Sequence, residues 1–216
     1  MMYNFDEAPD RQNTDCLKWD KRDEVFGKAD VIPMWIADMD FPTPPFIIEA
    51  LRKRLDHEIL GYSYRPDSYF ESFIRWTSDV YGWEIRREWI EFSPGVVPAL
   101  NMSTLAFTSP GDEIIIQPPV YPPFFGAVND HGRKLVFNHL VETEAGWMMD
   151  PDGLRRAITP RSRMLIFSNP HNPVGRAWTH DELYELAEIC HEKGIIILSD
   201  EIHSDLTMPG VKHVPL

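Results

Sequence analysis

Cysteines, basic residues and long apolar runs are scarce in this sequence of 216 residues, and each scarcity excludes a class of protein. Its two cysteines, Cys16 and Cys190, lie far apart, which favours free thiols over a disulfide framework. Lysines and arginines number 21 against 34 aspartates and glutamates, and the resulting net charge of −13 repels nucleic acid. No apolar run reaches membrane-spanning length, and residues 1–10 lack the apolar core of a signal peptide. The sequence therefore predicts a cytoplasmic protein that binds neither nucleic acid nor a membrane.

A regular alternation of strand and helix signals is present instead, and it is clearest over residues 179–199. Thr179 and Glu182 form the pattern of a capping box, and Gly194 is the expected residue after the helix end. Four apolar residues recur on one helical face between these ends: Leu183, Leu186, Ala187 and Cys190. The apolar run at residues 195–198 then predicts a strand buried on both faces of a parallel sheet.

The same alternation extends toward the N-terminus. Strands are expected at residues 114–117, 135–137 and 164–168. Helices are expected at residues 123–130, from Asp150 and Pro151 to near Ile158, after Gly95, and from an Asp67 cap with an apolar face of Phe70, Phe73, Ile74 and Tyr81. This order of elements predicts an α/β fold with a mainly parallel sheet.

Three of the expected strands end in polar, turn-rich loops, at residues 117–121, 168–173 and 199–203. Ligands of open α/β sheets bind at the carboxyl ends of the strands. We therefore expect these three loops to meet in one cleft.

Five segments follow one another along the chain: PMWIADMDF (residues 33–41), FSPGVVP (92–98), QPPVYPPF (117–124), NPHNPVG (169–175) and SDEIH (199–203). In this order they resemble the aminotransferase-like, fold type I enzymes that depend on pyridoxal 5'-phosphate (PLP). The chain is similar in particular to their cystathionine β-lyase (C–S lyase) subgroup of the MalY/PatB type. The resemblance implies a three-layer α/β/α large domain, incomplete here and preceded by an N-terminal arm. Residues 1–45 would form the arm and part of the small domain, and residues 46–216 the large PLP-binding domain.

The resemblance also implies which residues bind the cofactor ring. Asp200 would keep the pyridine nitrogen protonated, since an opposite charge at hydrogen-bond distance stabilises the charged ring. Asn172 and His203 would donate to the phenolic oxygen, with a purely structural histidine as the alternative for His203. Tyr121 would stack on the ring, with simple loop packing as its alternative.

The phosphate and the substrate are assigned in the same way. Backbone N–H groups of Gly95, Val96 and Val97 would hold the phosphate at a helix start, which needs no net positive charge. Tyr62 resembles the tyrosine that a neighbouring subunit donates to the phosphate, which implies a homodimer with a shared active site. The substrate pocket would include Trp35, Ala37 and Asp38, and no metal is expected.

A lysine that forms a Schiff base with PLP is required in this family, and none of the lysines here has its setting. Lys212 alone follows Asp200, and its surroundings resemble the rim of the pocket. We therefore expect the front part of a longer enzyme, inactive by itself. The function implied is α,β-elimination from an amino-acid substrate, cystathionine or another cysteine S-conjugate, giving a thiol, pyruvate and ammonia. The alternatives are a PLP-dependent aminotransferase on the same scaffold and a non-catalytic fragment.

Overall fold

The structure, a computed structural model, describes residues 3–216 and divides the chain into two compact units, Met1–Tyr64 and Arg65–Leu216. Met1 and Met2, which begin the segment without a signal-peptide core, lie outside the described residues. Within residues 3–216 no helix is long and apolar enough to cross a membrane. The expected domain boundary at residue 45 concerns a whole enzyme and stays a prediction.

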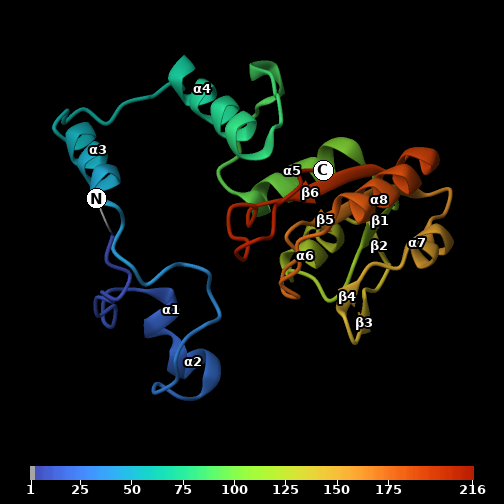
Figure 1. Cartoon of the computed structure of the whole chain (residues 1–216), viewed down its shortest axis with the longest axis horizontal. Helices are drawn as coiled ribbons and strands as arrows, with labels where there is room; N and C mark the ends of the chain where they lie inside the picture. The colour runs from blue at the N-terminus through green and yellow to red at the C-terminus, as the bar shows by residue number, and fades with distance from the viewer. Residues whose placement is uncertain (1–2) are drawn as a thin grey trace. The chain divides into compact units, whose positions relative to one another are not determined.

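One carboxylate organises much of the first unit. The helices of this unit are α1 (Leu17–Asp20), α2 (Arg22–Phe26) and α3 (Pro45–Leu55), labelled in Figure 1. Asp40 accepts hydrogen bonds from Lys18 Nζ at 2.7 Å, Trp19 Nε1 at 2.8 Å and Arg11 Nη1 at 2.6 Å. These donors hold the pKa of Asp40 well below its usual range, because they stabilise its charged form. Met34, by contrast, is 89% exposed, so polar contacts rather than apolar burial order this region.

The second unit begins with a helix that differs from the expected one. Its first elements are α4 (Asp67–Trp76), a π-helical turn (Thr77–Tyr81) and a 3₁₀ turn (Arg87–Trp89). The predicted Asp67 cap is wrong, because Pro66 occupies the capping position and Asp67 lies in the first turn. The predicted apolar face is only partly right, because Phe73 is 47% exposed and Tyr81 lies in the π turn. Periodicity identifies an apolar face but does not say what covers it.

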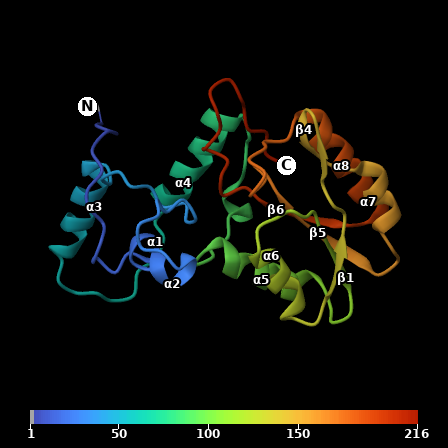
Figure 2. The ribbon, with the colours of Figure 1, turned by 90° about the horizontal axis from the view of Figure 1, so that it is seen from below.

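Four parallel strands form the central sheet of the second unit, in the order β2-β1-β5-β6. Their bounds are β1 (Glu113–Ile116), β2 (Lys134–Phe137), β5 (Ser162–Ser168) and β6 (Ile196–Asp200). Helices α5 (Val96–Phe107) and α6 (Pro123–Asn129) cover one face, and α7 (Pro151–Ala157) and α8 (His180–Lys193) cover the other, as Figure 2 shows. The predicted α/β/α layers and mainly parallel sheet are confirmed.

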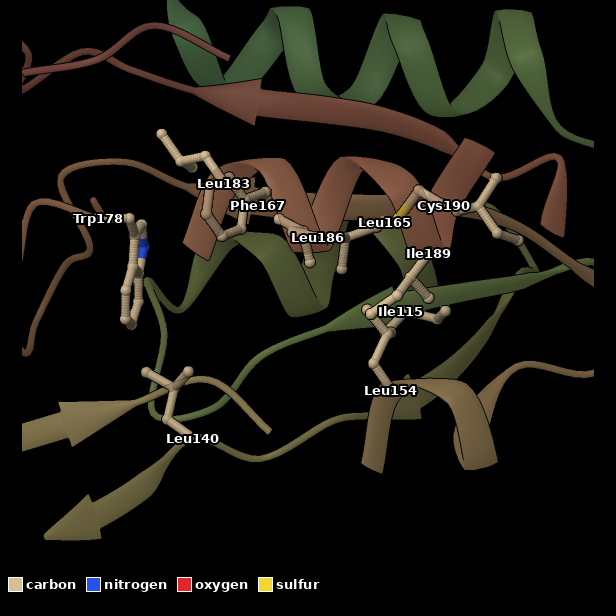
Figure 3. Close-up of a cluster of buried hydrophobic side chains, with 11 residues drawn as sticks. Ile115, Leu140, Leu154, Leu165, Phe167, Trp178, Leu183, Leu186, Ile189 and Cys190 are labelled. Carbon is tan, nitrogen blue, oxygen red and sulfur yellow. The ribbon is translucent and has the colours of Figure 1, made fainter. Parts of the chain in front are cut away.

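Alternation along the strands divides the apolar core into two clusters. Ile114, Ile116 and Ile166 pack with side chains of α5 and α6, while Ile115 and Leu165 pack with side chains of α7 and α8 (Figure 3). All five are fully buried. Burying a side chain of this size contributes about 1.5–3 kcal/mol. The two clusters therefore hold the helices on both faces of the sheet. They also fix the strand register, and with it the position of each strand end.

Two features of the sheet differ from the expectation or add to it. The prediction that residues 195–198 are buried on both faces is wrong, because Ile196 is 43% exposed. Among the described strands, β6 pairs with β5 alone and so forms an edge. A hairpin of β3 (Val141–Thr143) and β4 (Gly146–Met148) was not predicted, because its strands are only three residues long and mostly exposed.

Helix α8 begins and ends as its sequence predicts. The Thr179 hydroxyl accepts from the Glu182 N–H, the Glu182 carboxylate accepts from the Thr179 N–H, and Gly194 is left-handed at φ 65°. Three residues of the expected face are buried, whereas Ala187 is half-buried and Ile189 is buried instead. Burial raises the pKa of the Cys190 thiol to about 12, so this free cysteine is unreactive at neutral pH.

Replacing Thr179 by alanine should lower the free energy of unfolding by about 1 kcal/mol, because the first turn of α8 loses its capping hydroxyl. Urea unfolding followed by circular dichroism measures the change. Thr179→Ser keeps the hydroxyl and is the matched control. Equal unfolding midpoints for the two variants would show that the capping box contributes nothing.

Candidate functional site

The three polar loops lie next to one another at the carboxyl edge of the sheet. Strand β5 pairs in parallel with β1 on one side and with β6 on the other, so the chain leaves all three strands at the same edge. The Asn169 N–H donates to the Asp200 carbonyl at 3.0 Å, which joins the loops after β5 and β6. His171 Nε2 lies 3.0 Å from the Pro119 carbonyl oxygen, which joins the loops after β5 and β1. The expected convergence of these loops is therefore present.

Asp200 is a buried carboxylate at the end of β6. It pairs with Ser168 of β5 and is 9% exposed. Its Oδ1 accepts one hydrogen bond, from the Ile202 N–H at 3.2 Å. Burial raises the pKa of Asp200, while the Ile202 hydrogen bond and the charge of His203 act in the opposite direction. A buried carboxylate with this little compensation favours a cation beside it.

Asn172 lies in the loop after β5, and His203 lies three residues after Asp200 in the loop after β6. The Asn172 N–H donates to Ser168 Oγ at 3.2 Å, and Ser168 Oγ donates to the Pro170 carbonyl at 3.2 Å. Both Asn172 and His203 are half-buried, and within residues 3–216 neither side chain has a hydrogen-bond partner. The Asn172–Pro173 peptide bond is cis. The donors of both side chains are thus available at the loop surface.

Tyr121 is half-buried and contacts Phe124 edge-on, with ring centroids 6.2 Å apart and an interplanar angle of 82°. This contact fits the packing alternative, since it fixes the ring against the first turn of α6. A T-shaped contact occupies at most one face of the Tyr121 ring, so Phe124 leaves the other face for a second aromatic partner. The stacking role of Tyr121 stays a prediction.

The start of α5 presents backbone donors. Gly95 has φ +157°, a conformation that residues with side chains rarely adopt, and within the described residues no side chain caps the helix. Pro98 carries no N–H, so the free donors of the first turn come from Gly95, Val96 and Val97. Helix α5 packs against α6 and against β6, the strand whose last residue is Asp200. An anion is favoured at such a helix start.

His171 is a site residue that the sequence analysis missed. It is 1% exposed and lies edge-on to Trp178, with ring centroids 5.6 Å apart. Because a carbonyl only accepts, Nε2 must carry the proton shared with Pro119. Burial lowers the pKa of His171, although the nearby backbone carbonyls raise it. A neutral His171 therefore ties the loop of Asn172 to the loop of Tyr121.

Glu201 is a second residue that was missed. Its carboxylate accepts from Ser199 Oγ at 2.8 Å, the Leu216 N–H at 3.0 Å and His213 Nε2 at 2.9 Å. These bonds fasten the segment after β6 to the strand end. The partners lie up to 15 residues away from Glu201, so no local pattern indicates them.

Four of the predicted site residues belong to the first unit. Tyr62 is fully exposed, and Ala37 is also exposed. Trp35 Nε1 donates to the Lys18 carbonyl at 3.2 Å, and the Asp38 carboxylate pairs with Arg11. Their assignment to the phosphate and the substrate pocket stays a prediction.

Replacing Asp200 by asparagine should stabilise the chain at pH 8, because asparagine has a similar shape to aspartate but carries no charge that must be buried. The raised pKa means that the folded state of the wild type holds the proton more tightly, so its stability falls as pH rises through that pKa. The free energy of unfolding of Asp200→Asn should lack this fall. Below the pKa of the aspartate in the unfolded state, the wild type and the variant should have the same stability. Urea unfolding from pH 3 to pH 8 measures the difference. Glu144→Gln, at an exposed carboxylate of the hairpin turn, is the control. If the stability of Asp200→Asn fell with rising pH as much as that of the wild type, the raised pKa would not belong to Asp200.

Comparisons with known proteins show which family this chain matches. The family model described as aminotransferase class I and II matches residues 29–215. Cystathionine β-lyase PatB of Bacillus subtilis (strain 168) is 45% identical over 213 residues, which are 98% of this chain and 55% of that protein.

Two solved structures are similar over the whole fold. A PLP-bound putative aminotransferase of Clostridium difficile 630 has a TM-score of 0.95 at 43% identity, covering 99% of this chain and 55% of that one. Cystalysin of Treponema denticola, which contains PLP, has a TM-score of 0.94 at 38% identity, covering 100% of this chain and 55% of that one. The chain thus spans about half the length of the proteins it matches. Because the family model covers most of the sequence and the fold agrees, the chain belongs to the aminotransferase class I and II family.

Proposed function

We propose that this chain supplies the cofactor-binding part of a PLP-dependent C–S lyase that acts on cystathionine or another cysteine S-conjugate. The reaction would be an α,β-elimination that releases a thiol, pyruvate and ammonia. Similarity to PatB and to cystalysin supports this activity for the whole protein. The single observation that carries the cofactor assignment is the buried Asp200 carboxylate beside the loops of Asn172 and Tyr121.

The residues at this edge fit PLP. Asp200 would bind the ring nitrogen, and a positive charge there would offset the destabilisation that burial imposes on the carboxylate. Asn172 and His203 have side-chain donors without partners in the described chain, and they would bind the phenolic oxygen. Tyr121 would stack on the ring, held in place by its edge contact with Phe124.

The phosphate would bind the backbone N–H groups of Gly95, Val96 and Val97 at the start of α5. A chain with a net charge of −13 is unsuited to attracting anions by surface charge. Backbone donors and the helix dipole favour a phosphate locally without added lysines or arginines. The uncapped start of α5 supports this assignment.

The chemistry divides between the cofactor and the chain. Bound PLP supplies an electron sink that stabilises negative charge at the substrate α-carbon. Asp200 would hold the proton on the ring nitrogen, Asn172 and His203 would orient the ring, and Trp35, Ala37 and Asp38 would shape the substrate pocket. The base that removes the α-proton is proposed to lie in the part of the whole protein that these 216 residues do not include.

We propose that the whole enzyme is a cytoplasmic homodimer with a shared active site. Tyr62 is fully exposed in its own chain, which suits a residue that reaches the phosphate of a partner subunit. Cys16 and Cys190 are free, which suits a reducing compartment.

An aminotransferase is the second candidate. The similarity to a putative aminotransferase at a TM-score of 0.95 favours it, and both activities use the same cofactor contacts. The two candidates differ in the fate of the substrate: a lyase releases pyruvate and ammonia, whereas an aminotransferase passes the amino group to a keto acid.

The 216-residue chain should bind PLP reversibly, and Asp200→Asn and Asn172→Ala should each weaken binding by about tenfold, the effect of losing one hydrogen bond that involves a charged or strongly polarised partner. Quenching of intrinsic fluorescence by PLP measures the affinity. Glu188→Gln, on the exposed side of α8, should bind as the wild type does. Equal affinities for all four proteins would refute the cofactor site.

The whole protein should release pyruvate from cystathionine, and the 216-residue chain should not. Coupled reduction of pyruvate by lactate dehydrogenase measures the product. Borohydride should fix PLP to the whole protein but not to the 216-residue chain. Amino transfer to a keto acid without pyruvate release would favour the second candidate instead.

A further inference from the structure

The loop that carries Tyr121 has few backbone donors with which to hold its shape. Residues 118, 119, 122 and 123 are prolines, so only Val120 and Tyr121 keep an N–H between Gln117 and Phe124. In the part of the chain that the structure describes, neither of these two N–H groups has a backbone partner. Hydrogen bonds that tie this loop to the rest of the sheet must therefore come to its carbonyl oxygens.

Two carbonyl groups of the loop accept hydrogen bonds from other segments of the described chain. The Leu140 N–H donates to the Pro118 carbonyl at 2.8 Å. His171 Nε2 donates to the Pro119 carbonyl at 3.0 Å. Pro119 lies two residues before Tyr121, so the bond from His171 is the nearer of the two to the ring that would stack on PLP.

His171 is suited to this task because its own position is fixed. Its N–H donates to the Arg176 carbonyl at 2.7 Å, which closes the loop that contains Asn172. Its ring lies edge-on to Trp178, labelled in Figure 3, and Trp178 Nε1 donates to the Ser168 carbonyl at 3.0 Å. The donor to the loop of Tyr121 is thus held through both its backbone and its ring.

Burial decides by which route His171 can act on a ligand. The residue is 1% exposed, so its ring is unavailable for direct contact with a bound molecule. Its other ring nitrogen, Nδ1, is also buried and has no hydrogen-bond partner among the described residues. Any effect on a cofactor beside Tyr121 must therefore pass through the Pro119 carbonyl.

We propose that His171 is a positioning residue of the PLP site: by donating to the Pro119 carbonyl, it holds the Tyr121 ring where the face that Phe124 leaves free can stack on the cofactor. This inference rests on the proposed function, in which Tyr121 contacts PLP. The two contacts act on different parts of the loop. Phe124 restrains the ring of Tyr121, and His171 restrains the backbone that leads to it.

His171→Gln and His171→Met are a matched pair that tests the proposal. Both remove the imidazole and its contact with Trp178, and both side chains have similar length, but only glutamine keeps a donor for the Pro119 carbonyl. PLP should bind His171→Gln nearly as tightly as the wild type and His171→Met about fivefold more weakly, the effect of one hydrogen bond. Quenching of intrinsic fluorescence by PLP measures the affinity, and circular dichroism confirms that each variant is folded.

A second variant covers the case in which His171→Met does not fold. The amide of asparagine is one bond shorter than that of glutamine and places its N–H near the position of Nδ1 instead of Nε2. His171→Asn is therefore expected to weaken PLP binding relative to His171→Gln by the same factor as His171→Met.

Tyr121→Ala distinguishes positioning of the ring from a general loosening of the site. In this background the glutamine and methionine variants of His171 should bind PLP equally, because no ring remains to be positioned. In the Asp200→Asn background their difference should persist, because Asp200 would make a different contact with the cofactor.

Hydrogen exchange without PLP gives an independent measure of how firmly the loop is held. The Phe124 N–H donates to the Tyr121 carbonyl at 3.1 Å, so its exchange reports on opening of this loop. It should exchange about fivefold faster in His171→Met than in His171→Gln. The Gly132 N–H, which donates to the Asn129 carbonyl beyond the other end of α6, should exchange equally in the two variants. NMR measures both rates.

Three results would overturn the inference alone: equal PLP affinity of the glutamine and methionine variants, a difference between them that survives in Tyr121→Ala, and equal exchange of the Phe124 amide. In each case PLP binding that Asp200→Asn weakens would still support the proposed function. A folded wild-type chain that does not bind PLP would overturn both, so the two failures are distinguishable.

Discussion

The parallel pairing of β5 with β1 on one side and β6 on the other is the constraint on which the candidate site depends. It places Ser168 opposite Asp200 and brings the loop after β1 within one hydrogen bond of His171. A shift of one residue would turn each strand's side chains to the opposite face and bury the wrong set. The apolar clusters on both faces prevent that shift, so the core determines where the polar loops meet.

Polar groups at the carboxyl edge of the sheet and at the start of α5 have few hydrogen-bond partners within the described residues. Asp200 has one backbone donor and a pKa raised by burial, and the start of α5 has free N–H groups. One feature favours a cation and the other an anion. A zwitterionic cofactor with a protonated ring nitrogen and a phosphate would satisfy both, and the proposed site would therefore bind a phosphorylated molecule in spite of a net charge of −13.

The elements of the second unit were largely predictable from sequence. The capping box at Thr179, the Asp150 cap and the glycine after α8 all follow local rules, and the structure confirms them. Two predictions about these elements were wrong. Asp67 was expected to cap α4, and the run before Asp200 was expected to be buried on both faces, yet Ile196 is at an edge.

The sequence by itself determined the order of strands and helices and the motifs in the loops, because caps, turns and apolar periodicity act over a few neighbouring residues. Only the tertiary structure decided which groups meet. His171 and Pro119 are 52 residues apart, and Gln117 and Asn138 are 21 apart. A buried polar group needs a partner, but its identity depends on strand register and packing, which no local pattern encodes. The neutral histidine at the candidate site and the carbonyl to which it donates therefore became visible only in three dimensions.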